Sequence, residues 1–122
     1  MQGKEEKTAV RNLALAAASA AHDKKARAVE VLDLKRLSPL CDFFVIASGQ
    51  TWLQVRAIAQ GVEERVEEAG GRLDHREGDD QAGWVLLDFG DLVVHVFTEE
   101  LRQFYDLERL WEDAERVSVP NQ

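Results

Sequence analysis

The side chains that most resemble the machinery of an enzyme lie around one short turn. Asp88 and Asp91 stand on either side of a glycine, and His95 follows four residues later. Two or more carboxylate oxygens that converge on one point can hold a divalent cation. Turns favour Asp for backbone reasons, however. We therefore interpret Asp91 as a turn residue and Asp88 as a solvent-facing one, and we predict no metal site.

The other candidate ligands and nucleophiles are scattered along the chain. His22, His75 and His95 do not have the short spacing of zinc ligands, and Cys41 lies far from all three. A nucleophilic Cys41 beside His95 is one interpretation, and a buried small apolar side chain is the one we favour. A cysteine without an intramolecular partner fits a reducing cytosol.

A strand-to-helix turn at Ser48-Gly49 offers a third kind of chemistry, because a helix N-terminus can cradle a phosphate. The sequence lacks a glycine-rich phosphate loop with its lysine and the spaced glycines of a dinucleotide site. Nucleotidyl transfer also requires paired carboxylates on a following strand to hold magnesium. The acidic residues that follow lie in an expected loop: Asp74, Asp79 and Asp80. We predict a turn without a ligand, no catalytic residue and no cofactor.

Apolar residues at helical spacing predict the helices that would position these side chains. They fall at about residues 6–21, from residue 52 to Gly70-Gly71, and from Thr98 onwards. Thr51 and Gln54 have capping-box spacing at the start of the second helix. The expected apolar stripe of the last helix is Leu101, Phe104, Leu107 and Trp111.

Short apolar runs predict the strands. They cover residues 27–34, 43–47, 84–89 and 92–97, with a further short strand near 72–76. Gly90-Asp91 between the last two long runs is a strong hairpin signal. The order of elements predicts a single α/β domain, with a mixed β-sheet and helices packed on it. We expect the domain to span residues 8–113, between a flexible N-terminus (1–7) and a flexible C-terminal tail (114–122).

Length and composition agree with one domain that lies outside membranes. A chain of 122 residues with 45% hydrophobic residues can bury a core without disulfides or metal. No apolar run approaches the roughly 20 residues needed to cross a bilayer. The charged N-terminus is unlike a secretory signal. We expect a cytoplasmic protein.

Charge is distributed unevenly along the chain. Residues 1–61 hold nine Lys/Arg and six Asp/Glu, whereas residues 62–122 hold six and seventeen. Nucleic-acid backbones are bound by clustered Lys and Arg, so the acidic half would be repelled by them. A basic partner would be attracted. We expect no direct binding to nucleic acid.

Trp84 begins a strand in which alternate residues face opposite sides. If Val85 and Leu87 face the helices, Trp84, Leu86 and Asp88 line the other face. An aromatic side chain ringed by carboxylates is typical of a binding hot spot. A core position for Trp84 is an equally good interpretation of the sequence.

Taken together, these segments resemble the ribosomal silencing factor family, also called RsfS or Iojap. The resemblance runs in collinear order from about Thr8 to Trp111. It is carried by residues 41–49 (CDFFVIASG), 54–59 (QVRAIA), 77–78 (EG), 83–91 (GWVLLDFGD), 93–97 (VVHVF) and 102–111 (RQFYDLERLW). The resemblance implies a nucleotidyltransferase-like fold without the catalytic carboxylates.

The resemblance also implies a function and a site. Members of the family dock on protein fourteen of the large ribosomal subunit and sterically block joining of the small subunit, which represses translation when nutrients are scarce. Together with the alternation along the strand, this predicts a contact surface made of Trp84, Asp88, Phe89, Asp91 and His95, with Glu77 and Tyr105 at its edge. A homodimer is expected off the ribosome. A large-subunit assembly factor and a nucleotide-acting enzyme stay open as alternatives.

Overall fold

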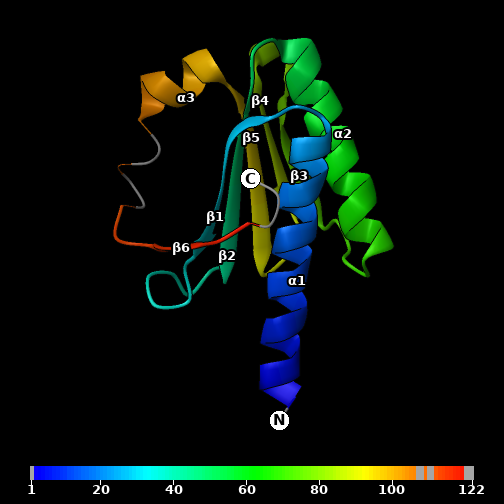
Figure 1. Cartoon of the computed structure of the whole chain (residues 1–122), viewed down its shortest axis with the longest axis vertical. Coiled ribbons are helices and arrows are strands. Elements are labelled where there is room, and N and C mark those ends of the chain that lie inside the picture. The colour runs from blue at the N-terminus through cyan, green and yellow to red at the C-terminus, as the bar shows by residue number, and fades with distance from the viewer. Residues whose placement is uncertain (1, 107–108, 110–111, 120–122) are drawn as a thin grey trace.

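The chain folds into one α/β unit with a six-stranded sheet (Figure 1). We describe residues 2–106, 109 and 112–119 of a computed structural model. The elements in chain order are α1 (Gln2–Asp23), β1 (Arg27–Asp33), β2 (Phe43–Gly49), α2 (Trp52–Glu68), β3 (His75–Asp79), a 3-10 turn η1 (Asp80–Ala82), β4 (Trp84–Asp88), β5 (Leu92–Thr98), α3 (Glu99–Tyr105) and β6 (Glu115–Val117). The predicted fold class is confirmed.

The strand order explains why the sheet is mixed. The strands run β3-β4-β5-β2-β1-β6 across the sheet, and β2 pairs with β5 in parallel. The other four pairings are antiparallel, including the predicted hairpin of β4 and β5. The chain passes through α2 between β2 and β5, which is the crossover that a parallel pair requires.

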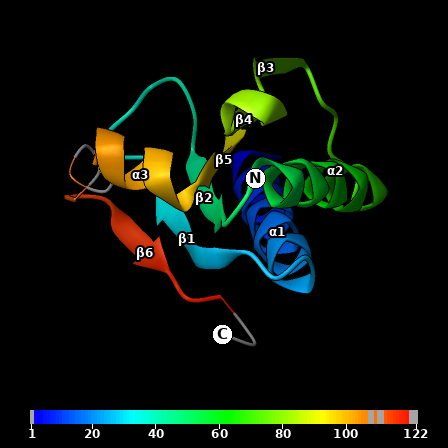
Figure 2. The same ribbon diagram turned by 90° about the horizontal axis from the view of Figure 1, so that it is seen from above.

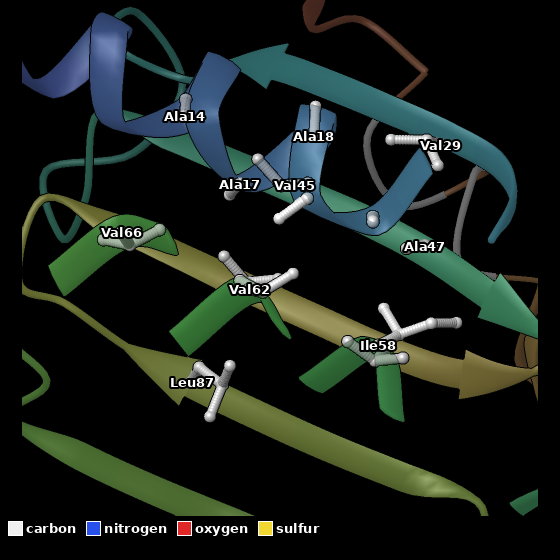
Figure 3. Close-up of a cluster of buried hydrophobic side chains, with 14 of the residues drawn as sticks. Ala14, Ala17, Ala18, Val29, Val45, Ala47, Ile58, Val62, Val66 and Leu87 are labelled. Atoms are coloured by element: carbon white, nitrogen blue, oxygen red, sulfur yellow. The ribbon is translucent and has the colours of Figure 1, made fainter. Parts of the chain in front are cut away.

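Helices α1 and α2 cover one face of the sheet, and α3 lies on the other side (Figure 2). Small side chains of α1 let this helix approach the sheet closely, and branched side chains of α2 fill the rest of the layer (Figure 3). The core residues drawn there include Ala14, Ala17, Ala18, Val45, Ile58, Val62, Val66 and Leu87, which are completely shielded from solvent. We call the helix-covered side the inner face and the opposite side the outer face.

Three features near the two ends of the chain differ from the sequence prediction. The predicted last helix is interrupted, because α3 ends at Tyr105 and Asp106 adopts a left-handed conformation (φ 48°). Leu107 and Trp111 of the expected stripe lie outside the described residues. Strand β6 pairs with β1 beyond the expected domain boundary at residue 113, and α1 begins before the expected boundary at residue 8. Flexibility of the two end segments stays a prediction.

None of the described helices is long and apolar enough to cross a membrane.

Candidate functional site

Strand β4 divides its side chains between the two faces, as the sequence predicts. Val85 and Leu87 are fully buried against the helices, while Trp84, Leu86 and Asp88 are half-buried on the outer face. The alternation follows from the pleat of a strand, which turns successive side chains to opposite sides. Trp84 is therefore neither a core residue of the inner face nor a freely exposed one.

The strand register brings residues of β5 and β2 next to those of β4 on the outer face. Leu86 pairs with His95 of β5, and His95 pairs in turn with Ile46 of β2. In the neighbouring row, Asp88 pairs with Val93. Residues paired in this way have their side chains on the same face. The outer face thus has an apolar centre bordered by Asp88.

Aromatic contacts connect the rows of the outer face. The ring of His95 lies parallel to that of Phe97, with centroids 5.8 Å apart and an interplanar angle of 7°. Phe97 stacks in turn with Trp84 at 6.2 Å, and Phe44 contacts His95 at 4.8 Å. Such contacts fix ring orientations and add to the stability gained from burial. The result is a continuous ladder of four rings across three strands.

His95 is held neutral by its surroundings. Burial lowers the pKa of its imidazole from 6.5 to about 4, and the carboxylate of Glu77 acts in the opposite direction. Its Nδ1 atom is buried and has no hydrogen-bond partner among the described residues. A charged imidazole would need solvent or a close counter-ion here. His95 at neutral pH is therefore an uncharged polar ring within an apolar ladder.

Trp84 also carries a polar group without a partner. Its indole Nε1 is buried and makes no hydrogen bond within the described part of the chain. The ring lies against Gly78 of β3, where an added Cβ would come within 2.8 Å of Trp84 Cε3. An unsatisfied buried donor costs free energy. The ring of Trp84 is consequently well packed, but its indole N–H has no acceptor among the described residues.

The two aspartates of the turn accept hydrogen bonds from backbone N–H groups. Asp88 Oδ1 accepts a hydrogen bond from the N–H of Gly90 at 2.8 Å, which stabilises a glycine at φ 90°. The carbonyl oxygen of Asp91 accepts from the N–H groups of Asp42 and Phe43 at 2.8 and 3.0 Å. Within the described ranges, no group of three His, Cys, Asp or Glu could hold a metal ion.

The remaining predicted contact residues occupy different places. Glu77 is exposed on β3 opposite Leu86, at the border of the outer face, and its carboxylate lies 2.8 Å from His75 Nε2. Tyr105 is 58% exposed on α3. Phe89 is 9% exposed and packs in the inner-face core. Phe89 thus does not join the outer face, because it continues the inward alternation of Val85 and Leu87.

The predicted residues also lie at two ends of the sheet. Asp91 precedes β5 and Tyr105 follows it in α3, with the seven residues of β5 between them. A strand rises about 3.3 Å per residue, so these ends are about 20 Å apart. Trp84 pairs with Phe97 near one end, while Asp88 and Asp91 lie at the other. Such a span suits an interface with a macromolecule and is too long for one small-molecule site.

Cys41 is a buried apolar residue, as predicted. It is 5% exposed in an outer-face cluster with Leu32 and Ile46. Burial raises the pKa of its thiol to about 11, and the charges of Asp42, Asp88 and Asp91 add to this effect. Since the thiolate is the reactive form, the group is chemically inert near neutral pH.

Arg102 is the residue of the outer side that sequence reasoning missed. It is 5% exposed, and its Nη1 donates to the hydroxyl of Ser48 at 2.8 Å. That contact occupies the turn that we considered for a phosphate. The adjoining pocket of about 470 Å³ is also lined by Glu99 and Asp106, whose charges disfavour a phosphate. The only sign of this role in the sequence is that Arg102 stands between Leu101 and Phe104, two apolar positions of the expected stripe.

Comparisons with known proteins agree with this fold. A family model described as "Ribosomal silencing factor during starvation" matches residues 7–122. The ribosomal silencing factor RsfS of Halalkalibacterium halodurans is 45% identical over 103 residues, which are 84% of this chain and 88% of that protein. RsfS of Bacillus subtilis is 44% identical over 98 residues, covering 80% and 83%. A crystal structure of a protein from Chromobacterium violaceum superposes with a TM-score of 0.80 at 33% identity, covering 92% of each chain. The chain belongs to the ribosomal silencing factor (RsfS) family.

Proposed function

We propose that the protein docks on protein fourteen of the large ribosomal subunit and blocks joining of the small subunit, acting in the cytoplasm without catalysis. Family membership carries the ribosomal part of this proposal. The outer face carries the docking part, because it combines a half-buried aromatic ladder with carboxylates at its border. We assign the contact to Trp84, Asp88, His95 and Glu77, with Asp91 and Tyr105 at its two ends.

The composition of the outer face suits a stable but reversible contact. Interface centres are rich in aromatic residues, and polar groups surround them. Trp84 and His95 each hold a buried nitrogen that lacks a partner among the described residues. A partner that supplies an acceptor to the N–H of Trp84 or a hydrogen-bonding group to Nδ1 of His95 would remove that cost on binding. Glu77 and Asp88 would meet the cationic side chains of a basic ribosomal protein.

The mechanism needs only competition for overlapping surface. A bound protein of 122 residues is large enough to occupy space that a second subunit would need. At about 100 times its dissociation constant, such a ligand opposes joining by roughly 2.7 kcal/mol. Inhibition should therefore follow the concentration of the protein and disappear at high small-subunit concentration.

A joining assay with purified subunits tests the proposal. Large subunits are incubated with the protein, small subunits are added, and joined ribosomes are measured by light scattering. We expect a dose-dependent loss of joining, which weakens as salt rises because exposed charges are screened over about 8–10 Å at physiological ionic strength. Unchanged joining at saturating protein would refute a silencing role. Binding that does not change with salt would refute electrostatic docking.

A matched pair of charge variants locates the contact. Glu77→Lys reverses a charge at the border of the outer face, and Glu67→Lys reverses one on the exposed surface of α2 over the inner face. Both variants change the net charge equally, so a general electrostatic effect would weaken both alike. We expect weaker binding for Glu77→Lys alone. Equal loss in the two variants would move the contact away from the outer face.

A further inference from the structure

The short helix α3 presents aromatic surface that the fold itself does not use. Phe104 is 77% exposed and Tyr105 is 58% exposed, and their rings meet edge to face at 5.1 Å. The helix lies on the outer side of the sheet, away from α1 and α2 (Figure 2). Two adjacent exposed aromatic rings are unusual on a free protein surface and mark a contact.

A buried arginine ties α3 to the sheet, in addition to an ion pair at 3.5 Å between Glu99 of α3 and Arg27 of β1. Arg102 Nη1 donates to the carbonyl oxygen of Ala28 at 2.6 Å and to the hydroxyl of Ser48 at 2.8 Å, and Nη2 lies 3.6 Å from Glu30 Oε2. These acceptors come from β1 and β2. Planar guanidinium groups suit such multiple fixed contacts. The position of Arg102, and with it the rotation of α3, is therefore defined from three directions.

Strand β1 is distorted where it receives this arginine. Its register with β2 shifts between Arg27 and Glu30, and Ala28 takes a positive φ of 49°. A left-handed conformation at alanine costs free energy, and a bulge redirects the groups around it. Here the redirected group is the Ala28 carbonyl that accepts from Arg102. The free-energy cost of this conformation in β1 is offset by the hydrogen bond that Ala28 accepts from Arg102 of α3.

The first turn of α3 continues directly into the outer face. Thr98 caps the helix by accepting from the N–H of Leu101 at 3.3 Å. A Cβ added at Gly83 would lie 3.0 Å from Thr98 Cγ2 and 3.1 Å from Leu101 Cδ1. Gly83 directly precedes Trp84. The helix consequently abuts the end of the outer face that holds Trp84.

We propose that Arg102 is the positioning residue of the docking surface: it orients α3 so that Phe104 and Tyr105 extend the outer face towards cationic side chains of the bound ribosomal protein. This inference rests on the proposed function. The charge of the helix supports a cationic partner. Glu100 is exposed near the aromatic pair, while Glu99 contacts Arg27 at 3.5 Å and Asp106 contacts Arg109 at 3.4 Å. Lysine and arginine bind the faces of such rings.

A double-mutant cycle tests whether Arg102 acts through α3. The variants are Arg102→Met, the double variant Phe104→Ala/Tyr105→Ala, and their combination. Binding to isolated large subunits is measured per folded molecule, with the folded fraction taken from circular dichroism. We expect each variant to bind about tenfold more weakly, and the combination to be no worse than about tenfold, because the aromatic pair is already misplaced without Arg102.

Two further variants separate positioning from general stability. Arg116→Gln removes an arginine that contacts the same Glu30 carboxylate at 3.1 Å from β6, without a described contact to α3. It should bind like the wild type. Ser48→Ala removes one acceptor of Arg102 and provides a milder variant if Arg102→Met folds poorly. In the free protein, both Arg102→Met and Ser48→Ala should speed amide hydrogen exchange in residues 99–105 above that elsewhere.

The outcomes distinguish this inference from the proposed function. Wild-type protein that does not bind large subunits would refute both. Wild-type binding combined with about 100-fold loss in the combined variant would refute the positioning role alone, because independent effects multiply. Folded Arg102→Met protein that binds like the wild type would refute it as well, and so would hydrogen exchange that is unchanged in residues 99–105.

Discussion

Replacing Trp84 by alanine and by phenylalanine separates its packing from its polar group. The ring is half-buried, stacks with Phe97 at 6.2 Å and lies against Gly78, while its Nε1 donor is buried without a partner among the described residues. Removing a fully buried tryptophan side chain costs about 3–5 kcal/mol. A ring that is partly exposed should cost about 2–3 kcal/mol.

Trp84→Phe should behave differently from Trp84→Ala. Phenylalanine keeps a ring on Phe97 and deletes the unsatisfied N–H, whose burial costs about 1–3 kcal/mol. That relief offsets the lost packing of the larger ring, so we expect stability within about 1 kcal/mol of the wild type. For a domain of this size, 1 kcal/mol corresponds to about 4 °C in melting temperature. Trp84→Ala should therefore melt about 10 °C lower, and Trp84→Phe within about 4 °C.

Thermal melts and large-subunit binding measured on the same samples complete the test. If Trp84 is central to docking, Trp84→Ala should weaken binding by about 2–4 kcal/mol at a temperature where the variant is fully folded. Trp84→Phe should weaken binding by only about 1 kcal/mol, because it keeps the ring but cannot donate to an acceptor of the partner. Equal destabilisation by alanine and phenylalanine would refute the argument from the unpaired indole. Folded Trp84→Ala protein with wild-type affinity would refute a docking role for this residue.

Four further predictions concern Asp88, His95, Cys41 and the oligomeric state of the free protein. Asp88→Lys should abolish binding to a basic partner, and it should lose about 1 kcal/mol of stability because the hydrogen bond to the N–H of Gly90 is removed. Asp88→Asn should keep that hydrogen bond. Thermal melts and binding assays on both variants check these expectations. The pKa of His95 is about 4 in the folded protein, and its ordinary value is 6.5. Between these pH values the imidazole therefore binds a proton in the unfolded chain and stays neutral in the folded chain. Wild-type stability should therefore fall by up to about 3 kcal/mol as pH drops from 6.5 to 4, and denaturant titrations of His95→Gln should show a correspondingly smaller fall. Cys41, with a pKa of about 11, should react with a disulfide reagent at pH 8 only after denaturation. Light scattering should show a homodimer of the free protein, and a monomer at high concentration would contradict it.

The sequence predicts those parts of the fold that depend on local patterns. The hairpin could be predicted because a Gly-Asp pair separates two apolar runs. The alternation along β4 could be predicted from strand geometry, although the sequence left open which side the helices cover. The cap of α2 follows the predicted spacing, since the hydroxyl of Thr51 accepts from the N–H of Gln54 at 3.2 Å. Each of these patterns needs contacts only within a few residues or along one strand.

The parts that the sequence did not predict depend on contacts between distant segments. The expected apolar stripe assigned Phe104 to the buried side of the last helix, yet Phe104 is exposed and Arg102 is buried. The reason is a set of acceptors on β1 and β2 that no helical periodicity can reveal. Strand β6 was missed similarly, because its three residues are defined by pairing with β1. Phe89 was assigned to the site together with Asp88 from the family resemblance, although adjacent residues of a strand face opposite sides.

We expect the two faces of the sheet to divide stability and recognition between them. The inner face holds most of the fully buried aliphatic residues, so the fold does not depend on perfect packing of the outer face. The outer face can then retain groups whose burial or exposure costs free energy in the free protein: the unpaired Nδ1 of His95, the unpaired indole N–H of Trp84 and an exposed aromatic pair. A partner that satisfies these groups gains free energy that the free protein does not have. The outer face is therefore the side where sequence changes should affect binding more than folding, and the inner face the side where the reverse should hold.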